Sequence, residues 1–248
     1  MITMKNTFKL LTALSFLCLP IGSAIASTTG AVGGASVKKG KSAVDFRVGY
    51  SESDESSSQD ERLRLRTHYD YGLTDYYALR VILSSDKRKG DNMEAESIAI
   101  ENRFYLLKAD EYGFDFGARL KYSHKDGDKK PDSAAIGLYQ QIPLEDWTIR
   151  FNETFSHEVG EDSTGGIALE LRSQAMYSIQ KNFNLGIESF NDIGNLNEQA
   201  GYSAQSHTIG PVIKGKFDNN IGYEAGYRTG ISDGAPDHSI KLFLSTSF

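Results

Sequence analysis

The chain has 248 residues with 27 basic and 33 acidic side chains, giving a formal net charge of −6. Its one cysteine, Cys18, excludes a small disulfide scaffold. We find no phosphate-binding glycine loop, metal-ligand cluster or nucleic-acid motif, so we expect no cofactor, no metal and no nucleic-acid partner. The hydropathy is that of a soluble protein, but a β-barrel exposes only every second strand residue to lipid. Composition alone therefore does not decide between the two classes.

Residues 1–26 have the pattern of a secretory signal peptide. Lys5 and Lys9 precede a mostly apolar stretch at 10–25, and residues 24–26 read Ala-Ile-Ala, a small-x-small cleavage pattern. A membrane anchor is the alternative, but the apolar stretch is short and Pro20 interrupts it. We therefore expect export, with cleavage before the next residue and removal of the only cysteine.

From residue 43 onward, apolar and polar side chains alternate in repeated short segments, after a Gly-rich lead at 27–42 that we expect to be flexible. Alternation of this kind is typical of strands with one apolar face. Gly, Asn, Asp and Pro clusters separate the segments, as in hairpin turns. Twelve strands are predicted, at residues 43–50, 62–71, 77–84, 97–107, 114–123, 134–142, 147–156, 167–179, 183–190, 208–216, 221–230 and 239–248.

The connections between these strands alternate strictly between short turns and long polar loops. The short ones lie at residues 72–75, 108–112, 143–146, 180–182 and 217–220, and the long ones at 51–60, 85–95, 124–133, 157–166, 191–203 and 231–237. An all-β transmembrane antiparallel up-and-down barrel with short periplasmic turns and longer extracellular loops has this asymmetry. A soluble sandwich or an eight-stranded lipocalin-like barrel does not predict it. We therefore expect a transmembrane barrel over residues 43–248.

The last predicted strand, at residues 239–248, gives further evidence for a membrane barrel. Ile240, Leu242 and Leu244 share one face of the predicted strand with Phe248 at its end. This pattern resembles the closing strand of bacterial outer-membrane barrels, in which the terminal aromatic residue is the assembly signal. The resemblance implies a location in the outer membrane, with lipid, lipopolysaccharide and the barrel-assembly machinery as partners. Aromatic residues at many other strand ends fit interfacial girdles.

The charged residues define which face of each strand points inward. In residues 62–66 the arginines share one face and the leucines the other, and each Arg facing lipid costs ~2–4 kcal/mol at the midplane. Applied to every strand, this parity predicts a basic lumen with fewer acidic side chains. The predicted pore-lining, solute-binding residues are Arg47, Arg62, Arg64, Arg66, Arg80, Arg103, Arg119, Lys121, Arg150, Arg172, Arg228 and Lys241.

Two residues do not fit this parity. Asn102 and Glu153 fall on the lipid-facing side, and a bulge, a register error or an oligomer contact could each explain them. Most remaining acids lie in the predicted long loops. There they either solvate the surface or bridge, through divalent cations, to lipopolysaccharide phosphates or a partner.

Candidate catalytic residues are few. The Ser–His neighbours at 123–124, 156–157 and 206–207 point to opposite faces of their strands, which prevents contact between nucleophile and base. His68 and Asp70 share the inner face without a nearby Ser, and a structural hydrogen bond is the expected role. Asp237 and His238 lack the paired aspartates of barrel proteases. We therefore predict no catalytic residues.

Twelve strands, short turns and a basic lumen together resemble the small monomeric outer-membrane channels for acidic sugars, the oligogalacturonate and sialic acid porin family. The resemblance extends over the whole expected mature chain, residues 27–248, and rests on architecture and charge. It implies a porin that lets small anionic solutes diffuse along an arginine track, whose guanidinium groups bind carboxylates in two places. The alternatives are a closed structural or adhesive barrel and, less favoured, a lipid- or peptide-hydrolysing enzyme.

Overall fold

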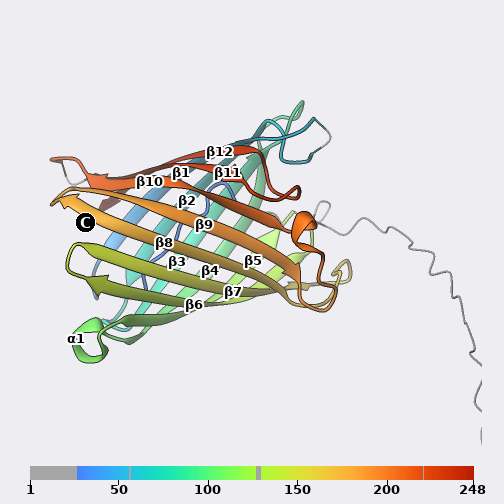
Figure 1. Ribbon diagram of the computed structural model, residues 1–248. Helices are drawn as coiled ribbons and strands as arrows, with labels where there is room; N and C mark the ends of the chain where they lie inside the picture. The colour runs from blue at the N-terminus through green and yellow to red at the C-terminus, as the bar shows by residue number, and fades with distance from the viewer. Residues whose placement is uncertain (1–26, 56, 127–129, 220) are drawn as a thin grey trace, which may run out of the picture.

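The computed structural model describes residues 27–55, 57–126, 130–219 and 221–248, so the predicted signal peptide lies outside the described residues. Each strand pairs antiparallel with its neighbours in sequence, and β1 pairs with β12 to close the barrel (Figure 1). The predicted fold class is confirmed. The strands are β1 (Ser42–Glu52), β2 (Arg62–Gly72), β3 (Tyr77–Lys87), β4 (Glu94–Leu107), β5 (Asp115–Lys125), β6 (Asp132–Leu144), β7 (Trp147–Val159), β8 (Ala168–Gln180), β9 (Phe183–Asn195), β10 (Ser206–Lys216), β11 (Gly222–Gly230) and β12 (His238–Ser247).

The predicted strands differ from the observed ones mainly at the ends that carry the long loops. There β7 continues to Val159 and β9 to Asn195, whereas the apolar alternation ends at residues 156 and 190. Asp132 of β6 pairs with Val159, so the backbone ladder continues where the side chains are already polar. Backbone hydrogen bonds do not require apolar side chains. The hydropathy pattern therefore shows the membrane-embedded part of each strand rather than its full length.

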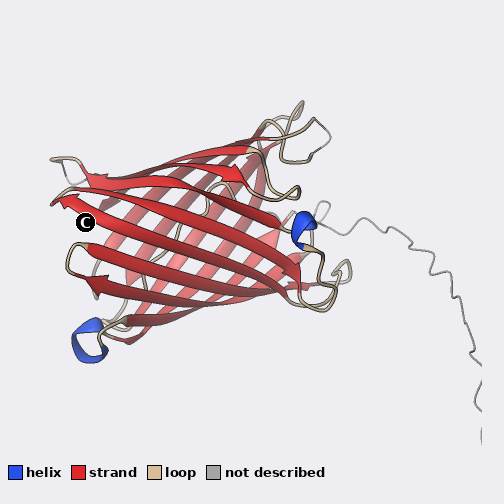
Figure 2. Ribbon diagram, in the orientation of Figure 1, coloured by secondary structure: helices blue, strands red, loops and turns tan. Residues whose placement is uncertain are grey.

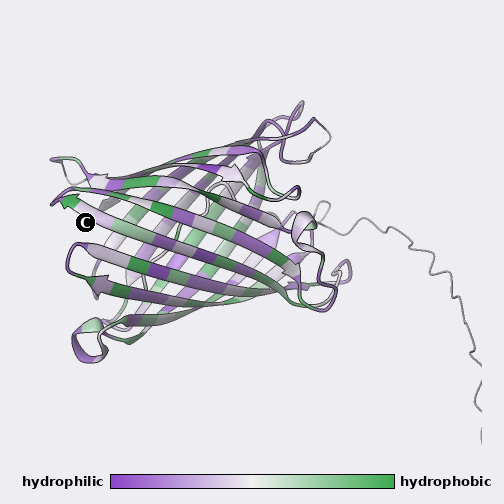
Figure 3. Cartoon of the chain, viewed as in Figure 1, coloured by the Kyte–Doolittle hydropathy of each residue, from purple (hydrophilic) through white to green (hydrophobic). Residues whose placement is uncertain are grey.

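The outer surface is apolar around the barrel. Alternating hydrophilic and hydrophobic bands run along the strands in Figure 3. Side chains such as Leu83, Ile100, Ile136, Ile187 and Ile240 are about half exposed on the outer face. A closed barrel pairs every strand edge and presents this apolar face to lipid, which is how a sheet crosses the outer membrane.

Aromatic residues gather at the barrel end that carries the short turns. Trp147 contacts Tyr177 with ring centroids 5.1 Å apart, and Phe217 lies 4.7 Å from Tyr223. At the same end, the backbone of Phe248 exchanges two hydrogen bonds with Ser42. These positions suit an interfacial girdle. The role of Phe248 in assembly stays a prediction.

Two short helices lie at opposite ends of the barrel (Figure 2). Helix α1 (Ala109–Tyr112) forms part of the connection between β4 and β5, and the 3-10 helix η1 (Tyr202–Ala204) precedes β10. Within the described part of the chain, no helix is long and apolar enough to cross a membrane.

The two residues that did not fit the predicted parity do lie on the lipid-facing side. Asn102 accepts a 2.7 Å hydrogen bond from the hydroxyl group of Tyr77, which satisfies its side-chain oxygen on this surface. Glu153 pairs across the ladder with Leu138 and Leu171, and its side chain has no hydrogen bond or ion pair among the described residues. A carboxyl group in this position is costly in lipid.

We therefore predict that Glu153→Leu stabilises the barrel. Removing the lipid-facing carboxyl group should raise the free energy of unfolding by about 1–2 kcal/mol. Denaturant unfolding in lipid vesicles measures this change. The matched control is Glu101→Leu on the inner face, which removes a carboxylate bound to Arg80 and should destabilise the protein. Equal effects of the two substitutions would contradict the assignment of faces.

Candidate functional site

The segment before β1 lies inside the barrel. Residues 27–41, which we call the strap, follow the lumen from the long-loop half to the short-turn end (Figure 1). Thr28, Thr29 and Val32 are at most 1% exposed. The sequence suggested only a flexible Gly-rich lead, because the segment has no periodic pattern. Its position is set by contacts with side chains distant in the sequence.

Arginines of the wall hold the strap through its main-chain oxygens. Arg172 donates a 3.0 Å hydrogen bond to the carbonyl of Ala31, and Arg119 donates one of 2.9 Å to the carbonyl of Gly34. The remaining bonds of this kind run from Arg47 to the Thr29 carbonyl and from Arg228 to the Ser27 and Thr28 carbonyls. Four of the predicted pore-lining arginines thus bind main-chain oxygens of the strap.

Small residues let the strap pass between the large side chains of the wall. A Cβ added to Gly33 would lie 2.7 Å from the guanidinium of Arg119, and one added to Gly30 would lie 2.8 Å from the ring of Phe190. Asn152 exchanges two hydrogen bonds with the backbone of Gly33, at 2.7 and 3.0 Å. The glycines of the strap therefore allow its backbone to lie close to the side chains of the barrel wall.

Beside the strap lies a cavity of about 180 Å³ that is strongly basic. Ala31, Gly33 and Gly34 of the strap form part of its lining, and the only carboxylates that line it are Glu101 and Glu170. Seven cationic side chains contribute to the same lining, namely Arg47, Arg66, Arg80, Arg103, Arg119, Lys121 and Arg172. In the confined lumen this excess of positive charge favours an anion.

Most of these cations already have a carboxylate partner. The ion pairs join Arg47 to Asp45, Arg80 to Asp70 and Glu101, Arg103 to Asp70, Arg119 to Glu101, and Arg172 to Glu170, at 2.5 to 3.4 Å. Arg66 differs, because within the described chain its side chain donates a hydrogen bond to the hydroxyl of Ser84 and not to a carboxylate. Lys121 has no ion pair or hydrogen bond among the described residues, and Arg150 binds only the amides of Gln141 and Gln174. These three cations are the least neutralised part of the wall.

A second charged cluster lies around Phe190, where β9 to β12 face the lumen. The ammonium group of Lys241 is 2.6 Å from carboxylates of both Glu188 and Glu224. The guanidinium group of Arg228 lies 4.0 Å from the centroid of the Phe190 ring. The ring also forms the only apolar cluster of buried residues found in the described chain, together with Val32 of the strap. The lumen is therefore filled by ion pairs rather than by an apolar core.

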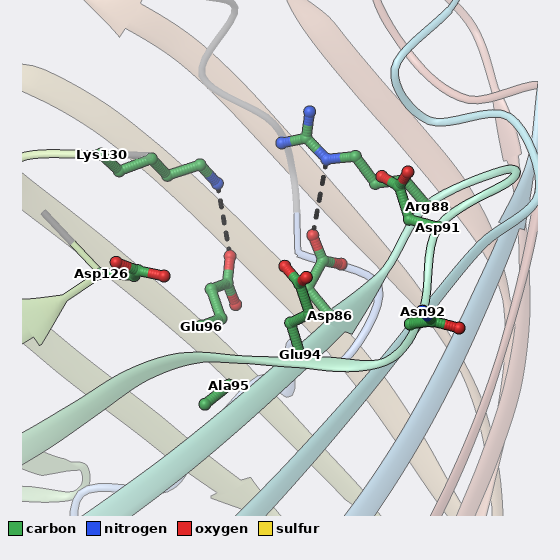
Figure 4. Close-up of a pocket in the computed structure, with 9 residues that line it drawn as sticks. All are labelled: Asp86, Arg88, Asp91, Asn92, Glu94, Ala95, Glu96, Asp126 and Lys130. Atoms are coloured by element: carbon green, nitrogen blue, oxygen red, sulfur yellow. Dashed lines mark hydrogen bonds and ion pairs between the residues drawn. The ribbon is translucent and has the colours of Figure 1, made fainter. Parts of the chain in front are cut away.

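At the long-loop end, a pocket of about 320 Å³ opens between β3, β4 and the loop after β5 (Figure 4). Two of its acids, Asp86 and Glu96, bind Arg62 and Arg64 at 2.5 to 2.8 Å, although the sequence placed these acids in external loops. They lie inside the mouth because the strands continue further than the alternation indicates. Lys130 also binds Glu96 at 3.3 Å, and burial lowers the pKa of this lysine.

The structure places all twelve predicted basic residues on the inner side of the barrel. It does not gather them into one site: Arg62 and Arg64 bind acids at the mouth, whereas Lys241 and Arg228 belong to the Phe190 cluster. Their role in binding a solute stays a prediction. The sequence missed Asn152, Tyr139 and Phe190, because an inward Asn or aromatic residue gives no signal that separates it from an ordinary strand residue.

The candidate catalytic residues remain apart. Ser123 is buried, whereas His124 is exposed and lies 3.0 Å from Asp132. His68 does not form the expected hydrogen bond with Asp70. Neither ring nitrogen of His68 has a hydrogen-bond partner in the described chain, and its nearest carboxylate is that of Asp45 at 3.7 Å. Asp70 binds Arg80 and Arg103 instead, since a guanidinium group is a stronger donor.

Solved structures share this fold over most of the chain. The KdgM porin has a TM-score of 0.59 at 10% identity, covering 83% of this chain and 99% of that chain. The NanC porin gives 0.59 at 10%, with 82% and 98% covered. An outer membrane channel from Pseudomonas putida F1 gives 0.59 at 10%, with 86% and 97% covered. These likenesses confirm the predicted resemblance at the level of the fold. No protein-family profile and no curated protein matches the sequence.

The buried ion cluster gives a testable prediction. Lys241→Met leaves Glu188 and Glu224 facing each other without their shared cation, and should lower the free energy of unfolding by about 3–5 kcal/mol. Urea unfolding in detergent micelles measures the change. The control is Lys216→Met, at an exposed position near the end of β10, which should have little effect. Equal stability of the two variants would mean that the cluster contributes nothing.

Proposed function

We propose that this protein is an outer-membrane channel for small anionic solutes, with acidic sugars as the substrate class, rather than an enzyme. The observation that carries the proposal is the lumen cavity in which seven cationic side chains face two carboxylates. Such a cavity lowers the energy of an anion on its way through the barrel. A KdgM porin has been solved in complex with disordered oligogalacturonate, which is a polyanionic sugar of this kind.

Unused hydrogen-bond donors support the same conclusion. Nε of Arg103 and Nη1 of Arg228 are buried without an acceptor among the described residues. His68 lines the cavity with both ring nitrogens unpaired in the same part of the chain. Buried donors normally find a partner, and groups that lack one are expected where a ligand or water completes the site. Carboxylate oxygens would accept hydrogen bonds from the two arginines and from the ring N–H of His68.

A closed structural barrel is the second candidate, because the strap occupies part of the lumen. Planar bilayer recordings separate the two functions. An anion-preferring conductance supports the channel, whereas a barrel that conducts neither with nor without the strap is structural.

The least neutralised cations should determine the selectivity. Replacing Arg66 and Lys121 together by Gln removes two positive charges from the cavity while leaving the described ion pairs intact, and should lower the anion-to-cation permeability ratio several-fold. Reversal potentials under a salt gradient measure this ratio. Lys181→Gln, in the exposed turn between β8 and β9, serves as the charge control. Unchanged selectivity in the double variant would exclude these residues from the solute path.

A further inference from the structure

We propose that the strap is an internal competitor of the solute, which closes the lumen at rest and is displaced when a polyanion enters. The proposal rests on the proposed channel function and adds the regulation of that same path. It begins from one juxtaposition: Arg47, Arg119 and Arg172 line the basic cavity and also donate hydrogen bonds to strap carbonyls.

The strap offers these arginines a weaker acceptor than an acidic solute does. A peptide carbonyl is neutral, whereas a carboxylate is charged and can accept two parallel hydrogen bonds from one guanidinium group, so it is the stronger acceptor. The free-energy gain from exchanging one carbonyl for one carboxylate is therefore favourable but small. A solute with several carboxylates can replace several strap contacts at once, so the strap discriminates by the number of charges as well as their sign.

Displacing the strap leaves the closed sheet intact. The sheet closes through the pairing of β1 with β12, and residues 27–37 take no part in any strand. Within the described residues, Val32 and Phe190 form the one apolar cluster that joins strap and wall. The hydroxyl oxygen of Thr28 is buried without a partner in the same part of the chain, so the seated strap is incompletely satisfied.

A turn at the short-turn end tethers the strap. The amide of Gly40 donates to the carbonyl of Gly72, and the amide of Lys39 donates to a side-chain oxygen of Asp75. Gly40 has a φ of +72°, which favours glycine. Cleavage at the predicted signal site would leave the strap with a free end in the lumen. Release then takes the form of a swing about this turn toward the periplasmic side.

The wall is also shaped to receive the strap. A Cβ added to Gly49, on the inner face of β1, would lie 2.7 Å from the carbonyl carbon and 2.8 Å from the carbonyl oxygen of Thr28. A side chain at this position therefore cannot coexist with the seated strap. Because β-branched residues suit a strand, Gly49→Val should dislodge the strap while leaving every lumen charge in place.

Conductance tests the closing role. Deleting residues 28–37, or replacing Gly49 by Val, should raise the single-channel conductance several-fold in planar bilayers. Ala225→Val, on the lipid-facing side of β11, is the matched control and should conduct like the unchanged protein. If the control conducts and both strap variants conduct no more than it does, the strap does not close the lumen. If neither variant conducts at all, the proposed channel function itself is wrong.

Thiol labelling tests the displacement. Val32→Cys places a buried thiol on the strap, and the natural Cys18 lies in the predicted signal peptide. In proteoliposomes, tri-galacturonate should speed labelling by N-ethylmaleimide several-fold, whereas an uncharged trisaccharide should not. Lys39→Cys, exposed in the tethering turn, should label equally under all conditions. Passage of tri-galacturonate through the protein with the thiol at position 32 still protected would overturn the displacement.

Discussion

The structure depends on one requirement, that every guanidinium group excluded from lipid must find an acceptor inside the barrel. The outer surface is apolar, so the arginines of each strand point inward together. Inside, they bind two kinds of acceptor: carboxylates on neighbouring strands, as in the pair of Arg172 with Glu170, and carbonyl oxygens of the strap, as in the bond from Arg172 to Ala31. The interior is therefore a network of charges instead of an apolar core.

This requirement connects stability with permeation. Arg119 binds Glu101 of the wall and Gly34 of the strap, and it also lines the basic cavity. In the proposed channel, an anion that passes this point competes with partners that help to hold the lumen together. Arg66 and Lys121 have no ion pair with a carboxylate in the described chain. In the proposed channel, they can therefore bind a solute anion without breaking an existing ion pair.

The charge along the lumen is uneven. At the mouth, Asp86 and Glu96 hold Arg62 and Arg64 in short ion pairs, and other acids line the same pocket. Further inside, cations exceed carboxylates around the cavity. In the proposed channel, a solute entering from the long-loop end therefore meets a largely neutralised entrance first and the basic region afterwards. For the proposed anion channel, this arrangement places the discrimination between anions and cations inside the barrel, next to the strap.

The sequence by itself determined the number of strands, their order and the face that each side chain occupies. These properties follow from local alternation, because a one-residue slip would place the arginines of residues 62–66 in lipid. Only the tertiary structure decided the partners. Arg62 binds Asp86 of the next strand, and Asn152 binds Gly33 across the lumen. Such pairs depend on how twelve strands curve into one closed wall, and no local pattern in a Gly-rich segment shows that it will lie inside it.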